Sequence, residues 1–90
     1  MIDLNKLAAL AYDCAVKRNK ITGHHDWEEF MKDLSSEFAE LACSGHIGKN
    51  VTSEELADVI LVCISIANHY HIDIEKAILD KMRFNSERND

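Results

Sequence analysis

Apolar residues recur at helical spacing in four stretches of the chain. The first runs from about Leu4 to Arg18 and follows Asp3, whose side chain suits an N-cap. The second begins after Asp26, which forms a capping-box pattern with Glu29, and it continues to about residue 44. No stretch alternates with the two-residue period of a strand. The pattern predicts an all-α domain, a four-helix bundle-like fold.

The third helix is expected to begin near Ser53, and its Val59–Ala67 run is apolar nearly all round. A helix of that kind is buried on most sides. In a four-helix domain of this size, such a helix is either central or covered by a second subunit. We therefore expect a homo-oligomer, either a dimer or a tetramer, with this helix at or near the interface.

The fourth helix, from Asp73 onward, carries a stripe that changes character along its length. The first half of the stripe is apolar, and the second half is cationic and polar: Ile74, Ala77 and Ile78, then Lys81, Asn85 and Arg88. If the apolar half packs on the bundle, the second half lines a pocket at one end. Cations in that pocket would complement a bound phosphate.

Composition narrows the class of protein. Ninety residues form one domain, spanning 1–90, and a chain of this size is marginal as a lone monomer. The net charge of −6 argues against nucleic acid as a partner, and the longest apolar run is too short to cross a membrane. The amino terminus lacks a signal-peptide layout, so we expect a cytoplasmic protein. The three cysteines fall on apolar helical positions, which predicts reduced, buried thiols.

Two pairs of carboxylates are the most distinctive chemical feature. Glu37 and Glu40 are three residues apart, as are Glu55 and Asp58. Residues at that spacing project from one helix face, so each pair forms a two-carboxylate claw. If their helices lie antiparallel, the claws can face each other and surround hard divalent cations, which prefer oxygen ligands.

Each claw also has a simpler explanation. A single Glu-x-x-Glu pair is usually a solvated helix face, and Glu55 could belong to a capping box that begins at Thr52 or Ser53. Asp58 is harder to explain in this way, because it is a poor helix former one turn into an apolar helix.

Three ordered blocks, at residues 34–42, 54–60 and 71–88, resemble the MazG-like all-α nucleoside triphosphate pyrophosphohydrolases, whose signature is ExxE followed by ExxD. The resemblance implies hydrolysis of a nucleoside or deoxynucleoside triphosphate, including noncanonical ones, to monophosphate and pyrophosphate. It implies Mg²⁺ as cofactor, with Mn²⁺ as a substitute, held by Glu37, Glu40, Glu55 and Asp58. It also places Lys81, Asn85 and Arg88 near the triphosphate. Many members have a glutamate just before ExxE, where this chain has Ser36.

In this scheme a metal-activated water attacks the α-phosphorus, and Glu37 and Glu40 are the candidates to take its proton. His24, His25 and Trp27 could line a base pocket beside the first claw, although a tryptophan at such a position is more often core. The spacing of the histidines does not favour a zinc site. The competing hypothesis is a catalytically silent helical module with an interaction or regulatory role.

Overall fold

The computed structural model describes residues 2–88, which form four helices and no strand. In chain order the helices are α1 (Leu4–Lys17), α2 (Trp27–Ser44), α3 (Lys49–His69) and α4 (Ile74–Ser86). The all-helical prediction and the number of helices are confirmed. None of the helices within residues 2–88 has the length and apolar character needed to span a bilayer.

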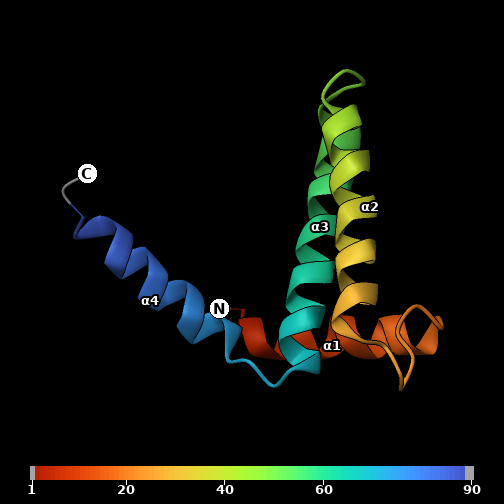
Figure 1. Ribbon diagram of the computed structural model, residues 1–90. Coiled ribbons are helices and arrows are strands. Elements are labelled where there is room, and N and C mark those ends of the chain that lie inside the picture. The colour runs from red at the N-terminus through yellow and green to blue at the C-terminus, as the bar shows by residue number, and fades with distance from the viewer. Residues whose placement is uncertain (1, 89–90) are drawn as a thin grey trace.

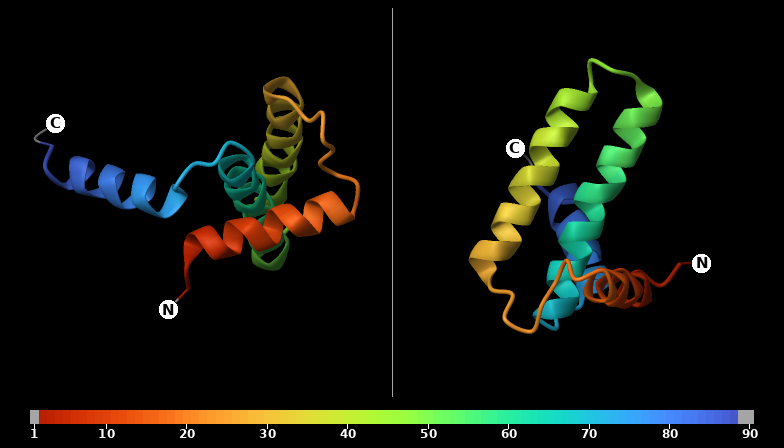
Figure 2. Two further views of the ribbon diagram at one scale, coloured as in Figure 1. Left: turned by 90° about the horizontal axis from the view of Figure 1, so that it is seen from below. Right: turned by 90° about the vertical axis from the view of Figure 1, so that its right-hand side faces the viewer.

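The helices α2 and α3 form an antiparallel hairpin, and α1 lies across its open end (Figures 1 and 2). A small core forms where these three helices meet. Its buried apolar side chains come from α1, the α1–α2 loop, α2 and α3: Ala8, Ile21, Phe30, Ile64 and Ala67. The upper part of the hairpin, toward the α2–α3 turn, is therefore held mainly by contacts between its two helices.

Two helix starts follow the expected caps. Asp3 precedes α1, and its Oδ1 accepts hydrogen bonds from the backbone N–H groups of Asn5 and Lys6. At the start of α2, Asp26 accepts from the N–H of Glu29 while the Glu29 carboxylate accepts from the N–H of Asp26. This reciprocal capping box fixes where α2 begins and hence the register of the first claw.

The start of α3 differs from the prediction, because the helix begins at Lys49 rather than near Ser53. The preceding Gly48 has a φ of +149°, a conformation that favours glycine, and it allows the chain to turn directly into the helix. Thr52 and Ser53 lie inside the helix, where their hydroxyls donate to the carbonyls of Gly48 and Lys49 at 3.1 and 3.0 Å. The capping-box explanation for Glu55 is therefore wrong.

The direction of α4 is set by a mutual cap between the starts of α1 and α4. The Asn5 side chain donates to Asp73 Oδ1 at 2.8 Å and accepts from the N–H groups of Ile74 and Glu75 at 3.1 and 3.3 Å. In return, Glu75 Oε1 accepts from the N–H of Leu4 at 3.2 Å. These bonds join the two helix starts and send α4 away from the hairpin (Figures 1 and 2).

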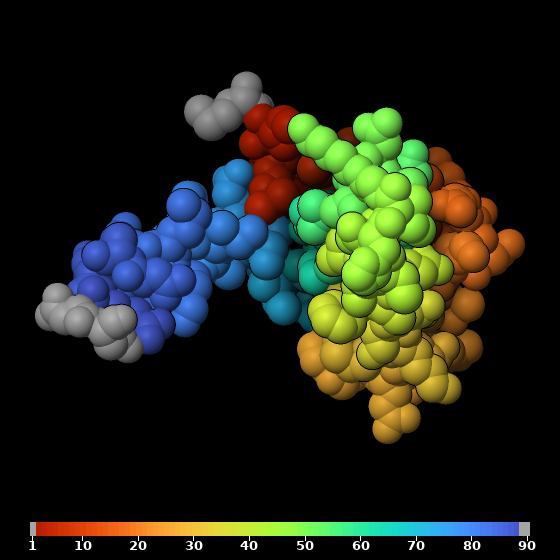
Figure 3. Space-filling view, turned by 90° about the horizontal axis from the view of Figure 1, so that it is seen from above, coloured from red at the N-terminus to blue at the C-terminus, as the bar shows by residue number. Residues whose placement is uncertain are grey.

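The pocket expected at the end of α4 depended on the apolar half of this helix packing on the bundle, and beyond its first turn α4 does not pack on the other helices. Ile78 and Leu79 on α4 are 41% and 59% exposed. Because the mutual cap with α1 holds only the first turn of α4, the rest of the helix extends into solvent (Figure 3).

The apolar run of α3 is only partly buried. Its inner side is covered, but Ile60 and Leu61 remain 55% and 42% exposed because none of the helices within residues 2–88 covers the other faces. Within residues 2–88, α3 is thus the helix that packs on both α1 and α2, while its outer faces stay uncovered. The same lack of cover leaves Cys14, Cys43 and Cys63 exposed as free thiols, so the prediction that they are buried is wrong.

The chain exposes more surface than a folded monomer of its mass. Its accessible surface is 7043 Å², whereas a compact protein of 10.2 kDa exposes about 5,300 Å². Its radius of gyration is 14.7 Å, against about 12 Å for a compact domain of 90 residues. The excess, about 1,700 Å², reflects the projecting α4 and the uncovered faces of the hairpin.

Candidate metal centre and adjoining cleft

The antiparallel hairpin brings the two claws face to face, as the spacing of the carboxylates predicts. Glu37 and Glu40 come from α2, and Glu55 and Asp58 come from α3. One carboxylate oxygen from each residue lies within 4.8 Å of the others. Two sequence-distant pairs thus form one four-carboxylate cluster.

Two members of this cluster have a carboxylate oxygen that is shielded and has no hydrogen-bond donor among residues 2–88. Glu37 and Glu55 are partly buried, and the Oε2 atom of each is shielded from solvent without a hydrogen-bond donor. Glu40 and Asp58 are exposed. Because a shielded acceptor without a partner is costly, a positively charged ligand at the cluster would supply the partner that these two oxygens lack.

The surroundings of the cluster disfavour ionisation of Glu37 and Glu55. Burial raises the pKa of Glu37 above its usual value of 4.5, and the neighbouring charges of Glu40 and Asp58 raise it further. The pKa of Glu55 is raised by burial and by the neighbouring charges of Glu40 and Asp58. Each of these causes disfavours the charged carboxylate. A bound cation would favour the charged form and so lower the pKa values of Glu37 and Glu55.

The dimensions and donor atoms suit a hard divalent cation. Oxygens on opposite sides of Mg²⁺ are about 4.2 Å apart, and those around Ca²⁺ are up to about 5.2 Å apart. The 4.8 Å limit in this cluster falls within that span. An all-oxygen set favours Mg²⁺, Mn²⁺ or Ca²⁺ over Zn²⁺, which prefers nitrogen and sulfur ligands.

A cleft of about 540 Å³ opens directly beside the cluster, and Glu37 and Asp58 form part of its wall. Its volume lies within the range typical of small-molecule sites. The other lining residues come from α1, the α1–α2 loop, α2 and α3, and most are apolar or small: Ala11, Cys14, Ala15, Arg18, Lys20, Ile21, Phe30, Asp33, Ser36, Leu61, Val62 and Ser65.

Three charged residues of the cleft were not among the predicted site residues. Arg18 and Lys20 supply the positive charge in the lining, and Asp33 supplies a carboxylate outside the cluster. Sequence signals for two of them exist. Arg18 follows Ala11 by seven residues and so continues the apolar stripe of the first helix, while Asp33 precedes Glu37 by four residues and shares its helix face.

The predicted phosphate-binding residues of α4 lie elsewhere. Lys81, Asn85 and Arg88 are exposed, no residue of α4 lines the cleft, and α4 points away from the hairpin (Figures 1 and 2). The Lys81 ammonium and the Arg88 guanidinium lie 4.9 and 5.8 Å from the ring centre of Phe84. A single chain therefore does not bring these residues to the carboxylate cluster.

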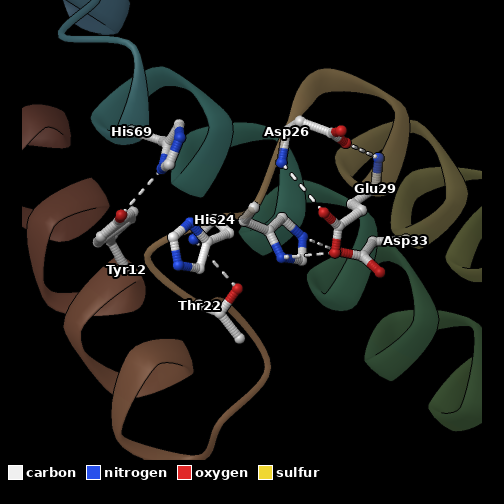
Figure 4. Close-up of polar contacts among 8 residues, drawn as sticks. Tyr12, Thr22, His24, Asp26, Glu29, Asp33 and His69 are labelled. Carbon is white, nitrogen blue, oxygen red and sulfur yellow. Dashed lines mark hydrogen bonds and ion pairs between the residues drawn. The ribbon is translucent and has the colours of Figure 1, made fainter.

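The residues expected around a base pocket have separate environments. His24 is exposed, and its N–H donates to Thr22 Oγ1 at 3.3 Å. Trp27 is 55% exposed and packs edge-on against Tyr70, so its assignment to the core is wrong. Neither residue lines the cleft. His25 is buried, and its Nε2 lies 2.8 Å from Asp33 Oδ2. Figure 4 shows that the Asp33 side chain lies beside that of Glu29.

Comparison of the chain with protein-family models, with curated proteins and with solved structures finds no match.

Proposed function

We propose that the protein is a magnesium-dependent nucleoside triphosphate pyrophosphohydrolase. The observation that carries this proposal is the cluster of Glu37, Glu40, Glu55 and Asp58, with two shielded and unpartnered oxygens, at the wall of a cleft of substrate size. Four carboxylates at one point suit a cation better than a packing role. The ordered sequence blocks that resemble the MazG-like enzymes support the same reaction. We place this activity in the cytoplasm.

The four carboxylates would hold Mg²⁺, or Mn²⁺ in its place. A divalent cation in this position supplies positive charge to phosphate oxygens and lowers the pKa of a bound water. Glu37 and Glu40 remain the candidates to accept the proton of the attacking water. Glu37 borders both the cluster and the cleft, which suits that role.

We assign Arg18 and Lys20 the role of neutralising charge on the phosphates. They line the same cleft as Glu37 and Asp58, and their loop is joined to α2 by the buried His25 and its bond to Asp33. Cations at that position can stabilise negative charge as it moves to the leaving pyrophosphate.

The direct test is to incubate the purified protein with Mg²⁺ and a panel of common, deoxy and modified nucleoside triphosphates and to measure monophosphate and pyrophosphate. Glu40→Ala and Asp58→Ala should lose most of the activity, because both residues are exposed cluster members whose loss should leave the core intact. Glu54→Gln, an exposed position outside the cluster, is the matched control and should keep activity. Absence of turnover, or equal turnover in the cluster variants, would support the catalytically silent module instead.

We further propose that a second copy of this chain covers the exposed apolar surface. A per-chain excess of about 1,700 Å² corresponds to the large interfaces of obligate homodimers, which bury roughly 2,000 to 5,000 Å² in total. The apolar residues available for it include Ile60 on α3 and Ile78, Leu79 and Met82 on α4. A role for Lys81, Asn85 and Arg88 at the cluster requires such a partner to bring α4 to it.

Sedimentation and light scattering test this self-association. The parent protein should be a dimer or tetramer at micromolar concentration, and Leu79→Asp with Met82→Asp should dissociate it. Lys76→Asp on a polar position of α4 is the control for added negative charge. A parent protein that is monomeric throughout would refute the proposed interface.

A further inference from the structure

The strongest additional feature of the molecule is the contact between His25 and Asp33 at the wall of the cleft. The His25 side chain is only 6% exposed, whereas that of Asp33 is 44% exposed. The imidazole Nε2 lies 2.8 Å from Oδ2 of Asp33. One partner is thus anchored in the core while the other faces the cleft.

The surroundings of His25 fix its position from several sides. Its ring packs edge-on against Phe30 at a centroid distance of 4.4 Å, and its Nδ1 lies 3.6 Å from Glu29 Oε2. The N–H of His25 donates to the carbonyl of Thr22 at 3.1 Å. A side chain held in this way keeps the Asp33 carboxylate in one orientation toward the cleft.

Asp33 is left with one carboxylate oxygen for a ligand. Oδ2 is engaged by His25, and none of the hydrogen bonds found among residues 2–88 uses Oδ1. Asp33 also lies outside the four-carboxylate cluster. It is therefore an oriented hydrogen-bond acceptor in a cleft whose remaining wall near Phe30, Leu61 and Val62 is apolar.

Besides the cations Arg18 and Lys20, the cleft offers an apolar wall and one oriented acceptor, and this combination can bind a nucleobase as well as phosphates. A flat base can bury its faces against apolar side chains, while its polar edge requires partners of matching polarity. The cleft shares Glu37 and Asp58 with the cluster, so a nucleotide whose phosphates lie at the cluster can extend its nucleoside into the cleft.

We infer that this cleft holds the nucleoside of the substrate and that Asp33, positioned by His25, selects bases that carry an exocyclic amino group. A carboxylate accepts a hydrogen bond from the amino group of cytosine or adenine. In uracil and hypoxanthine a carbonyl oxygen takes the place of that amino group and would face the carboxylate. The inference rests on the proposed nucleotide hydrolysis and adds to it the class of base.

Matched pairs of substrates test this selection: cytidine against uridine triphosphate, and adenosine against inosine triphosphate, each as ribo and deoxy forms. Each pair differs by an amino group in place of a carbonyl oxygen, and the adjacent ring nitrogen changes with it from an acceptor to an N–H donor. In the parent protein, kcat/KM should favour the amino-bearing member by about 10- to 100-fold in at least the better-accepted pair, the range expected for one hydrogen bond to a charged group.

Asp33→Asn is the decisive variant, because it keeps an oxygen for His25 and offers an N–H₂ group to a base carbonyl. In this variant the ratio of kcat/KM for the amino-bearing substrate to kcat/KM for its carbonyl-bearing partner should fall to near one or reverse. Glu28 is an exposed carboxylate of α2 outside the cleft, so Glu28→Gln should leave that ratio unchanged. His25→Ala should reduce the ratio in the same direction, with rescue by His25→Gln. Circular dichroism and Mn²⁺ binding confirm that each variant remains folded with its cluster intact.

The outcomes separate this inference from the proposed function. Turnover that depends on the cluster but shows no preference for amino-bearing bases would overturn the inference and leave the hydrolase proposal standing. Equal loss of kcat/KM for both members of a pair in Asp33→Asn would assign Asp33 a purely structural role and also overturn it. If no triphosphate is hydrolysed and no nucleotide binds in the presence of Mg²⁺, both proposals fall.

Discussion

Replacing Glu37 with glutamine should stabilise the metal-free protein while removing its response to divalent cations. The change keeps the size of the side chain and its place beside the core, but removes one of four carboxylates whose ligand oxygens lie within 4.8 Å of one another. It also gives the shielded Oε2 position a group that needs no cation. A structural carboxylate would behave in the opposite way, because its removal would destabilise the fold.

The size of the effect follows from the geometry. Two unit charges 4.8 Å apart repel by about 0.9 kcal/mol in bulk water and by about 3.5 kcal/mol at an effective dielectric constant of about 20. Glu37 has three such neighbours, but solvent and partial protonation screen a site that is open on one side. We expect a net gain of about 1 to 2 kcal/mol, which for a domain of this size raises Tm by roughly 5 to 15 °C.

Calorimetry or thermal denaturation at neutral pH and low salt, with and without Mn²⁺, measures both effects. The parent should gain stability on adding Mn²⁺, since a ligand that binds only the folded state raises Tm. Glu37→Gln should start higher and gain much less. Glu54→Gln removes the same charge outside the cluster and should shift stability by no more than about 0.5 kcal/mol. A lower Tm for metal-free Glu37→Gln, or an unchanged response to Mn²⁺, would refute the electrostatic reasoning.

Three further predictions concern pH, charge and helix orientation. Because the pKa values of Glu37 and Glu55 are raised in the folded protein, folding takes up protons. The metal-free protein should therefore become more stable as pH falls from 7 toward their usual value of 4.5, as measured by thermal denaturation, and stability that instead increases as pH rises from 4.5 to 7 would contradict the assigned shifts. Arg18→Ala should lower kcat/KM by about tenfold or more, the loss expected for a charge-assisted phosphate contact, whereas Lys17→Ala should have little effect. Equal effects of the two variants in an activity assay would show that Arg18 does not belong to the site. Asn5→Ala should cost about 1 kcal/mol, since it removes the side-chain cap of α4, and should speed hydrogen exchange at Ile74 and Glu75. Unchanged exchange there would mean that α4 is held by other contacts.

The local signals of the sequence predicted the helices and the carboxylate cluster well. Asp3 and the Asp26–Glu29 capping box set the starts of α1 and α2 through hydrogen bonds to nearby backbone, which depend on few residues. The cluster was predictable for a similar reason. Glu37 with Glu40, and Glu55 with Asp58, each share a helix face, and a short connection between two helices brings them together antiparallel.

The features that could not be predicted depend on contacts between distant parts of the chain. Asn5 caps α4 from 68 residues away, and that bond to Asp73 turns α4 and its cations away from the cluster. No periodicity in α4 reveals this direction. The stripe of apolar residues on α3 likewise shows that burial is needed but not what provides it, and within one chain Ile60 and Leu61 stay exposed.

The role of Asp33 was hidden for a different reason. Taken alone, it is one more acidic residue on a helix with several others, and its significance comes from the buried His25, eight residues earlier, that orients it. The early start of α3 at Lys49 was also unpredictable from propensity, because it depends on the unusual backbone conformation of Gly48.

Hydrolysis in water labelled with heavy oxygen tests the central claim most directly, because the position of the label reports which phosphorus is attacked. In the presence of Mg²⁺, the account predicts that the label enters the nucleoside monophosphate, that pyrophosphate is released unlabelled, and that Glu40→Ala and Asp58→Ala abolish both products. Release of nucleoside diphosphate with labelled inorganic phosphate, or product formation that is unaffected by loss of the cluster carboxylates, would contradict it.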